Sequence, residues 1–198
     1  WFIRTSRIKE RLVQLNQAPV GAWFALTTEM LQILACALDI GRLSQGAFDI
    51  GVGALVDAWG FGAARSAPDA SAIRAARALA HGPAHETLEL DLHAGRARKL
   101  APLQIDLCGI AKGYAVDCAV AVLQRCGVRH GSVNAGGDLR TFGDTPEGLP
   151  LAVRNPADPA SQISLGILRN RAVATSGEFF LGREGGPGKL SPIVDPAR

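Results

Sequence analysis

The chain has 198 residues, of which 47% are hydrophobic and 20% are charged, and its formal net charge is +3 at pH 7. This length fits one domain with a hydrophobic core, and the composition is ordinary for a globular protein. The small charge and the lack of a Lys/Arg-rich run exclude a nucleic-acid-binding surface, and no apolar run reaches the roughly 18 residues of a membrane span. We therefore expect a single domain over residues 1–198 with no nucleic-acid partner. Because Trp1 is not an initiating residue, we expect the natural N-terminus to precede it.

The first part of the chain is predicted to be mainly helical. A helix over 29–43 is expected, capped by Thr27 or Thr28. A short helix near 52–58 follows, and then a surface helix over 69–80, capped by Asp69 or Ser71. The apolar face of the first helix is assigned to Met30, Ile33, Leu34, Ala37, Leu38 and Ile40.

Beyond residue 87 the apolar period changes from helical to two. Leucines alternate with acidic residues over 88–92, and a turn at His93-Ala-Gly95 predicts a hairpin. We expect a third strand over 102–107, a helix over 110–125, and short strands near 131–135, 151–154, 162–168 and 171–175. The pattern favours an α+β fold with a mostly antiparallel sheet covered by helices.

The four cysteines are Cys36, Cys108, Cys118 and Cys126, and no two of them form a Cys-x-x-Cys pair. With no histidine at ligand spacing, a zinc site is not expected. Cys118 and Cys126 lie on the helix predicted over 110–125 or just after it, among alanine and valine neighbours. We expect these thiols to be buried.

The strongest local signal for a ligand site is the run Ile105-Asp-Leu-Cys-Gly-Ile-Ala-Lys-Gly-Tyr114. It reads as a strand end, a tight turn at Gly109 and a helix start, where free backbone N–H groups attract anions. Asp106 adds a carboxylate and Lys112 a cation, which together suit a phosphate with a divalent metal. A helix-capping turn with a solvated lysine explains the run equally well.

Three other short motifs have two interpretations each. In Ala47-Phe-Asp49, the carboxylate suits a sugar hydroxyl or ring N–H and the phenyl ring suits a heterocycle, but a turn residue beside a core residue is favoured. Asn134-Ala-Gly-Gly-Asp138 indicates either close ligand approach or a left-handed turn. Thr175-Ser-Gly177 suits a phosphate or an ordinary turn. The four histidines fall near predicted turns or element ends, without a partner that would make one a base.

Four blocks that contain several glycines follow one another along the chain, at 44–62, 105–117, 133–138 and 172–177. In this order they resemble the FAD:protein FMN transferase family, the ApbE-type flavin transferases. The likeness is most specific at Gly46-Ala-Phe-Asp-Ile-Gly-Val-Gly53, followed by Trp59-Gly-Phe-Gly62, and at Asp106-Leu-Cys-Gly-Ile-Ala-Lys-Gly-Tyr-Ala-Val-Asp117. The Gly-Gly and Thr-Ser-Gly motifs follow in the family's order, so the resemblance runs from about Arg7 to Pro196.

The resemblance implies an α+β domain that binds FAD and, with Mg²⁺, transfers FMN to a Thr or Ser of an acceptor flavoprotein with release of AMP. Gly109 matches a position that gives a backbone carbonyl oxygen to the metal. The positions that match FAD contacts are Ala47, Phe48 and Asp49 on the adenine side, Asp106 and Lys112 around the helix start, and Ile193. At Asp49 this implied role replaces the turn interpretation that local sequence favours.

The chain departs from the family pattern at two of its own residues. Pro192 stands where a histidine implicated in transfer is usual, and Ser6 stands where an aromatic covers the flavin. Proline neither moves a proton nor donates a hydrogen bond, so no catalytic residue is assigned. The family's other metal ligands, an Asp and a Thr, and an FAD-contacting Met would lie outside residues 1–198.

These departures leave two alternatives to transfer: hydrolysis of FAD to FMN and AMP, or FAD binding without catalysis. A Rossmann-type oxidoreductase is disfavoured because no Gly-x-Gly-x-x-Gly follows a first strand. By resemblance, the protein is expected at the periplasmic side of the inner membrane, tethered through a preceding N-terminal segment, with the cytoplasm as the alternative location.

Overall fold

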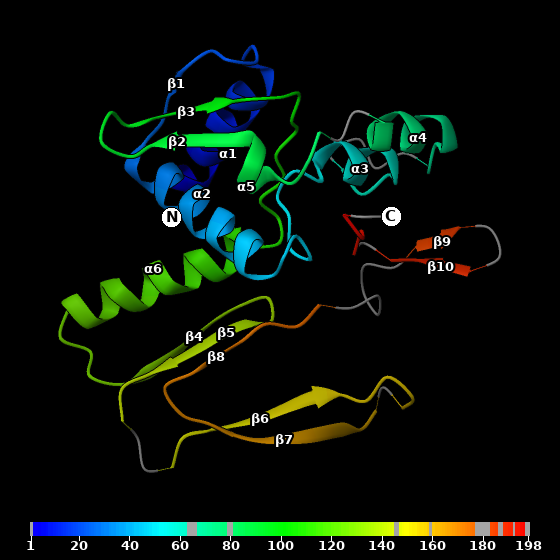
Figure 1. Cartoon of the computed structure of the whole chain (residues 1–198). Helices are drawn as coiled ribbons and strands as arrows, with labels where there is room; N and C mark the ends of the chain where they lie inside the picture. The colour runs from blue at the N-terminus through cyan, green and yellow to red at the C-terminus, as the bar shows by residue number, and fades with distance from the viewer. Residues whose placement is uncertain are drawn as a thin grey trace. The chain divides into compact units, whose positions relative to one another are not determined.

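The structure, a computed structural model, describes residues 2–62, 67–78, 81–144, 147–158, 160–176, 183–185, 188–191 and 193–196. Contacts along the chain define two compact units. The first consists of Trp1–Gly109 and Arg183–Arg198, and the second of Ile110–Gly182. Figure 1 labels the helices and strands of both units.

Helices dominate the first unit. They are α1 (Phe2–Gln17), α2 (Thr28–Leu43), α3 (Gly53–Ala58), α4 (Ala70–Ala78) and α5 (Ala84–Thr87). Helix α2 begins as predicted, because Thr27 Oγ1 accepts a 3.3 Å hydrogen bond from the Met30 N–H. Its predicted apolar face is buried except for Ile40, which is 38% exposed. Helix α4 has the predicted cap, since Asp69 Oδ1 accepts from the N–H groups of Ser71 and Ala72.

Two small antiparallel sheets complete the first unit. Strands β1 (Phe24–Ala25), β3 (Arg96–Lys99) and β2 (Leu88–Asp91) form one in that order, and β9 (Arg183–Gly185) pairs with β10 (Gly188–Leu190) in the other. The predicted β2–β3 hairpin is confirmed, although Leu92 lies beyond its first strand and is 62% exposed. The sequence did not predict α1, α5, β1, β9 or β10.

The predicted strand over 102–107 is wrong. This segment is extended but makes only an isolated parallel bridge, between Gln104 and Val52. Two backbone hydrogen bonds flank the bridge, from Gly53 N to Gln104 O at 3.0 Å and from Asp106 N to Ile50 O at 2.8 Å. On its other side the segment has no neighbouring strand among the described residues, and the N–H of Ile105 donates to the side chain of Asn16 instead.

Asn16, near the end of α1, holds this extended segment in place. Its Nδ2 donates to Ile105 O at 2.9 Å and its Oδ1 accepts from Ile105 N at 2.8 Å, so one amide satisfies both backbone groups of a residue that is 3% exposed. Lys99 Nζ donates to Asn16 O at 2.6 Å, which satisfies a carbonyl in the last turn of the helix. Burial lowers the pKa of Lys99. The segment that leads to Asp106 is therefore anchored on α1, and Lys99 of β3 in turn bonds the end of α1.

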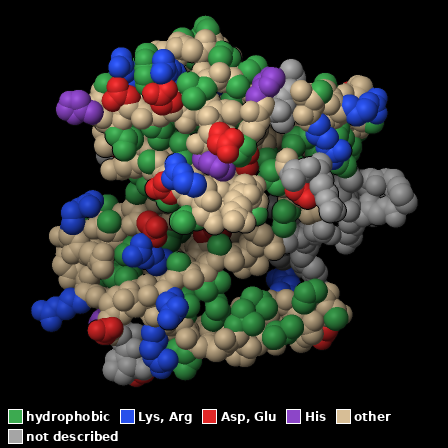
Figure 2. All heavy atoms as spheres, viewed as in Figure 1, with side chains coloured by type: hydrophobic (Ala, Val, Ile, Leu, Met, Phe, Trp, Pro, Cys, Tyr) green, Lys and Arg blue, Asp and Glu red, His purple; other side chains and the backbone are tan. Residues whose placement is uncertain are grey.

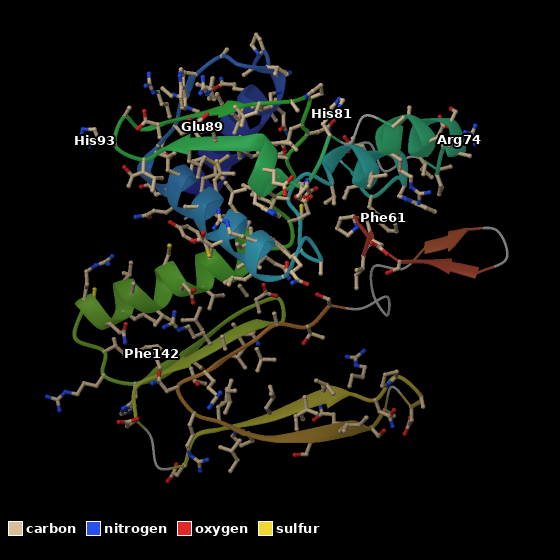
Figure 3. All side chains as sticks on the ribbon, in the orientation of Figure 1. Phe61, Arg74, His81, Glu89, His93 and Phe142 are labelled. Atoms are coloured by element: carbon tan, nitrogen blue, oxygen red, sulfur yellow. The ribbon has the colours of Figure 1, made fainter. Side chains whose placement is uncertain are left out.

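The second unit is built on α6 (Ala111–Arg125), which packs on β4 (Gly131–Ala135) and β5 (Asp138–Phe142). Strand β5 is central in an antiparallel sheet with β8 (Ala172–Val173), in the order β4-β5-β8. Val116 and Val120 of α6 are buried, as is Phe142 at the end of β5 (Figure 3). The sequence analysis missed β5, although a Gly-Gly turn before an alternating Asp-Leu-Arg-Thr run is a hairpin signal.

Strands β6 (Leu149–Arg154) and β7 (Gln162–Leu168) form a separate two-stranded sheet in the same unit. A register shift lies between Leu151 and Ala152, opposite Gly166, whose φ is +107°. Apolar side chains gather on this hairpin in Figure 2, and Ile163, Leu165 and Ile167 of β7 are 44%, 56% and 54% exposed.

The predicted fold class, α+β with mostly antiparallel strand pairing, is confirmed. All pairings between named strands are antiparallel, and the strands that the structure describes are distributed over four small sheets. No helix within the described ranges has the length and apolar character needed to cross a bilayer.

Replacing Asn16 by alanine is expected to lower the free energy of unfolding by about 1–3 kcal/mol, because both backbone groups of a buried residue would lose their partner. Chemical denaturation would measure the change. Gln14→Ala is the matched control on the same helix, since Gln14 is exposed and its amide accepts only from exposed Arg11. Equal destabilisation by the two substitutions would contradict the anchoring role of Asn16.

Candidate functional site

The loop after α2 is ordered by its own polar side chains. Gln45 and Gly46 have φ values of 54° and 82°, which turn the chain at the end of the helix. The N–H of Phe48 then donates to Ser44 Oγ at 3.0 Å. Asp49 Oδ1 accepts from Gly51 N at 2.8 Å and from Ala84 N at 3.0 Å, so it also joins the loop to the start of α5. The segment 47–49 is therefore held in one conformation.

Gly53 allows this loop to lie directly against the extended segment before α6. A Cβ on Gly53 would lie 2.7 Å from the carbonyl oxygen of Gln104, which is a backbone atom with little room to move. The two hydrogen bonds between 50–53 and 104–106 need this approach. At least one glycine of the 46–53 motif, Gly53, is therefore explained by a backbone contact within the protein.

A second turn, at 106–109, lies beside the first. Asp106 Oδ1 accepts from Cys108 N at 2.6 Å, which forms an Asx turn. A Cβ on Gly109 would lie 3.2 Å from Cε2 of Phe48, so the phenyl ring packs where a side chain would otherwise stand. Two segments that the sequence predicted as site components, one with Phe48 and one with Asp106 and Gly109, are therefore neighbours in the first unit.

The pKa of the Cys108 thiol is shifted by its surroundings in this turn. Although the residue as a whole is exposed, partial burial of the sulfur and the Asp106 carboxylate raise the pKa of its thiol to about 11. The thiolate is disfavoured beside a carboxylate, so Cys108 is not an activated nucleophile at neutral pH. The expected burial of Cys118 and Cys126 is wrong, since both are exposed. Cys118 lies between Val116 and Val120 in sequence, about 200° around the helix from each, because successive residues turn by about 100°.

In the second unit, α6 begins at Ala111 and has Lys112 in its first turn. The helix N-cap is Ile110, which makes no side-chain capping bond. Lys112, in the first turn, donates to Asp138 Oδ1 at 3.0 Å, and their side chains are 54% and 16% exposed. The structure therefore joins two motifs that the sequence analysis treated separately, the helix start and Asn134-Ala-Gly-Gly-Asp138.

Gly136 and Gly137, the two glycines of that motif, form a turn. Gly136 and Gly137 have φ values of 63° and 98°, and a Cβ on either would meet nothing within 4 Å. Ala135 pairs with Asp138 across them, which is the geometry of a two-residue type I′ hairpin. Of the two interpretations of this motif, the left-handed turn is the one the structure has.

Several other residues that the sequence analysis singled out are exposed or lie outside the described residues. Ile193 is 60% exposed and its N–H donates to Ser191 Oγ at 3.1 Å. Pro192 and Gly177 lie outside the described residues, and the side chain of Ser6 is likewise not described. Thr175 and Ser176 are exposed after β8. His81 and His93 are exposed in turns (Figure 3).

The described residues fit at most part of a magnesium site. No group of three or more His, Cys, Asp or Glu within them could hold a metal ion. Mg²⁺ typically keeps several waters and uses one or two protein oxygens together with substrate phosphates. The backbone carbonyl of Gly109 is compatible with such a site. A hollow of about 370 Å³ lined by Glu10, Arg11, Gln14 and Thr27 includes none of the predicted site residues.

Comparison with known proteins decides the family. The model of the ApbE family matches residues 3–198. This chain is a member of the ApbE family. The ApbE match covers the turns at 47–49 and 106–109 as well as the lysine of α6.

Named ApbE relatives agree with this assignment. The chain is 33% identical to a FAD:protein FMN transferase of Vibrio cholerae, over 97% of this chain and 58% of that protein. It is 31% identical to one of Rhodobacter capsulatus, over 93% of this chain and 36% of that protein. The apo crystal structure of the Pseudomonas stutzeri flavinyl transferase ApbE superimposes with a TM-score of 0.76 at 29% identity, over 93% of this chain and 58% of the other. The chain thus spans little more than half the length of several ApbE proteins that it matches.

Gly53→Ala is expected to lower the free energy of unfolding by about 1–3 kcal/mol, because its Cβ would overlap the Gln104 backbone. Gly113→Ala in α6 is the matched control, since a Cβ there would meet only Asp138 Oδ2, at 3.9 Å. That substitution should be neutral or stabilise by up to about 1 kcal/mol. Thermal or chemical unfolding would compare them, and a neutral Gly53→Ala would contradict the close approach.

Alkylation of Cys108 at pH 8 is expected to be slow, because its raised pKa leaves little thiolate. Asp106→Asn should speed it, since the amide oxygen still accepts from the Cys108 N–H while the carboxylate charge is gone. Mass spectrometry of each modified cysteine would follow the rates, with exposed Cys36 as the internal reference. An unchanged Cys108 rate would show that Asp106 does not contribute.

Proposed function

We propose that this chain forms the FAD-binding part of an FAD:protein FMN transferase, which moves FMN from FAD onto a Thr or Ser of an acceptor flavoprotein and releases AMP. The observation that carries the proposal is the adjacency of Phe48, Asp106 and Gly109 in a chain that matches the ApbE family over residues 3–198. Two turns far apart in sequence lie together, and the family resemblance implies that both contact FAD.

The chemistry of each turn suits a different part of FAD. Asp49 uses Oδ1 for the backbone of Gly51 and Ala84, and a carboxylate has further lone pairs that can accept from adenine or ribose donors. Phe48 offers a ring edge beside Gly109. The first turn of α6 offers backbone N–H groups and Lys112, which suit the pyrophosphate.

Transfer requires little base strength from the protein. The acceptor hydroxyl oxygen forms a bond to the FMN phosphorus and gives its proton to water, the pyrophosphate P–O bond breaks, and AMP leaves with the bridging oxygen. Such reactions depend mostly on positioning and charge stabilisation. Mg²⁺, where bound, would neutralise pyrophosphate charge, with the Gly109 carbonyl as one ligand.

Hydrolysis of FAD to FMN and AMP is the second candidate, favoured by Pro192, which cannot act in proton transfer. FAD binding without turnover is the third. We also propose a periplasmic location at the inner membrane, which rests on the family resemblance alone. Export of a reporter fusion in the natural host would test it.

FAD titration of the complete natural protein, with and without Mg²⁺, tests the function. We expect FAD binding that Mg²⁺ strengthens, and transfer of FMN to a protein acceptor carrying a Thr or Ser, with one AMP per FMN attached. Mass spectrometry of the acceptor and of the small molecules would measure both products. Free FMN and AMP in equal amounts would support hydrolysis, and binding without products would support the non-catalytic candidate. No FAD binding would refute all three.

A further inference from the structure

Lys112 is a cation at a helix position that disfavours cations. It lies in the first turn of α6, where the helix dipole is positive and where no acidic residue precedes it in the helix. Its partner is Asp138, 3.0 Å away on β5. Because Asp138 is only 16% exposed and Lys112 is 54% exposed, the carboxylate is the fixed member of the pair and the ammonium is the one that reaches solvent.

Asp138 is fixed by the hairpin that carries it. It is the first residue of β5, directly after the Gly136-Gly137 type I′ turn, and Asn134 Oδ1 accepts from Gly137 N at 3.0 Å to close that turn. Strand β5 is hydrogen-bonded on both sides, by β4 and β8. The other carboxylate oxygen faces α6, because a Cβ on Gly113 would lie 3.9 Å from Asp138 Oδ2.

We propose that Asp138 is a positioning residue that holds Lys112 ready for the pyrophosphate of FAD, an inference that rests on the proposed function. A lysine ammonium has three N–H donors, and Asp138 Oδ1 accepts one of them. Two donors remain for phosphate oxygens. The flexible four-carbon stem loses rotamer freedom when it is fixed, and the ion pair fixes it before the ligand arrives.

Helix α6 and strand β5 also share a second ion pair, which serves as a matched control. Arg140 of β5 and Asp117 of α6 form an ion pair at 2.6 Å, with side chains 37% and 57% exposed. It joins α6 to β5 as the Lys112–Asp138 pair does, but lies more than a helical turn along α6 from Lys112. Asp117→Asn therefore removes one helix–strand ion pair without changing the lysine.

The test is a double-mutant cycle on the complete natural protein, with FAD and riboflavin as ligands. Asp138→Asn should weaken FAD binding about two- to fivefold, the range of a partly exposed ion pair. Lys112→Met should weaken it about tenfold or more, since it removes a charged hydrogen bond to phosphate. The double variant should bind FAD no more weakly than Lys112→Met, because Asp138 acts only through the lysine.

Two further results separate positioning from a structural role. Riboflavin, which has no phosphate, should bind all variants equally, and Asp117→Asn should bind FAD like the wild type. Equal weakening by Asp117→Asn, additive losses in the double variant, or unchanged FAD binding by Asp138→Asn would each overturn the inference. Tighter binding by Asp138→Asn would also overturn it, because the carboxylate would then compete with phosphate for Lys112.

The failure of this inference can be told from the failure of the proposed function. If the wild type binds FAD and the cycle shows no coupling, only the role of Asp138 is refuted. If the wild type binds no FAD, the proposed function is refuted, and the role of Asp138 falls with it. Thermal unfolding of every variant, followed in parallel, would identify any loss of affinity that reflects unfolding.

Discussion

A single amide, that of Asn16, connects the end of α1 to the segment on which the candidate site is built. It pairs with both backbone groups of Ile105, a residue 89 positions later, and so takes the place of a neighbouring strand. The next residue, Asp106, donates its N–H to Ile50, which brings in the loop after α2. Phe48 lies against Gly109, at the end of this segment. The geometry of the first unit around the site therefore depends on a residue that carries no ligand chemistry.

Local features of the fold were predictable because their causes are local. Thr27 caps α2 and Asp69 caps α4 within three residues of each helix start, and the β2–β3 hairpin follows from alternating leucines before a turn. The predicted strand at 102–107 was wrong for a long-range reason. Its apolar alternation is that of a strand, but among the described residues the segment makes only one bridge, to Val52, and Asn16 rather than a strand bonds Ile105 on the other side. No sequence pattern links residues 16, 52 and 105.

The candidate site was predictable in its components but not in its connections. The helix start at Lys112 and the glycine turn before Asp138 were each identified as signals, yet nothing in the spacing of 26 residues indicates that the two side chains pair. The sequence also did not distinguish glycines that allow another group to approach closely from glycines that form a turn. The φ values of Gly136 and Gly137 decide for a turn, whereas Gly53 and Gly109 are close-approach positions. The glycines of the family motifs thus have two different physical causes.

The first unit is discontinuous in sequence, since residues 183–198 return to it after the whole of the second unit. The second unit, Ile110–Gly182, is continuous in sequence. Domains generally fold during synthesis as their residues emerge from the ribosome. All residues of the second unit can therefore be synthesised before the last residues of the first unit are. Translation order and folding order are expected to differ in this protein.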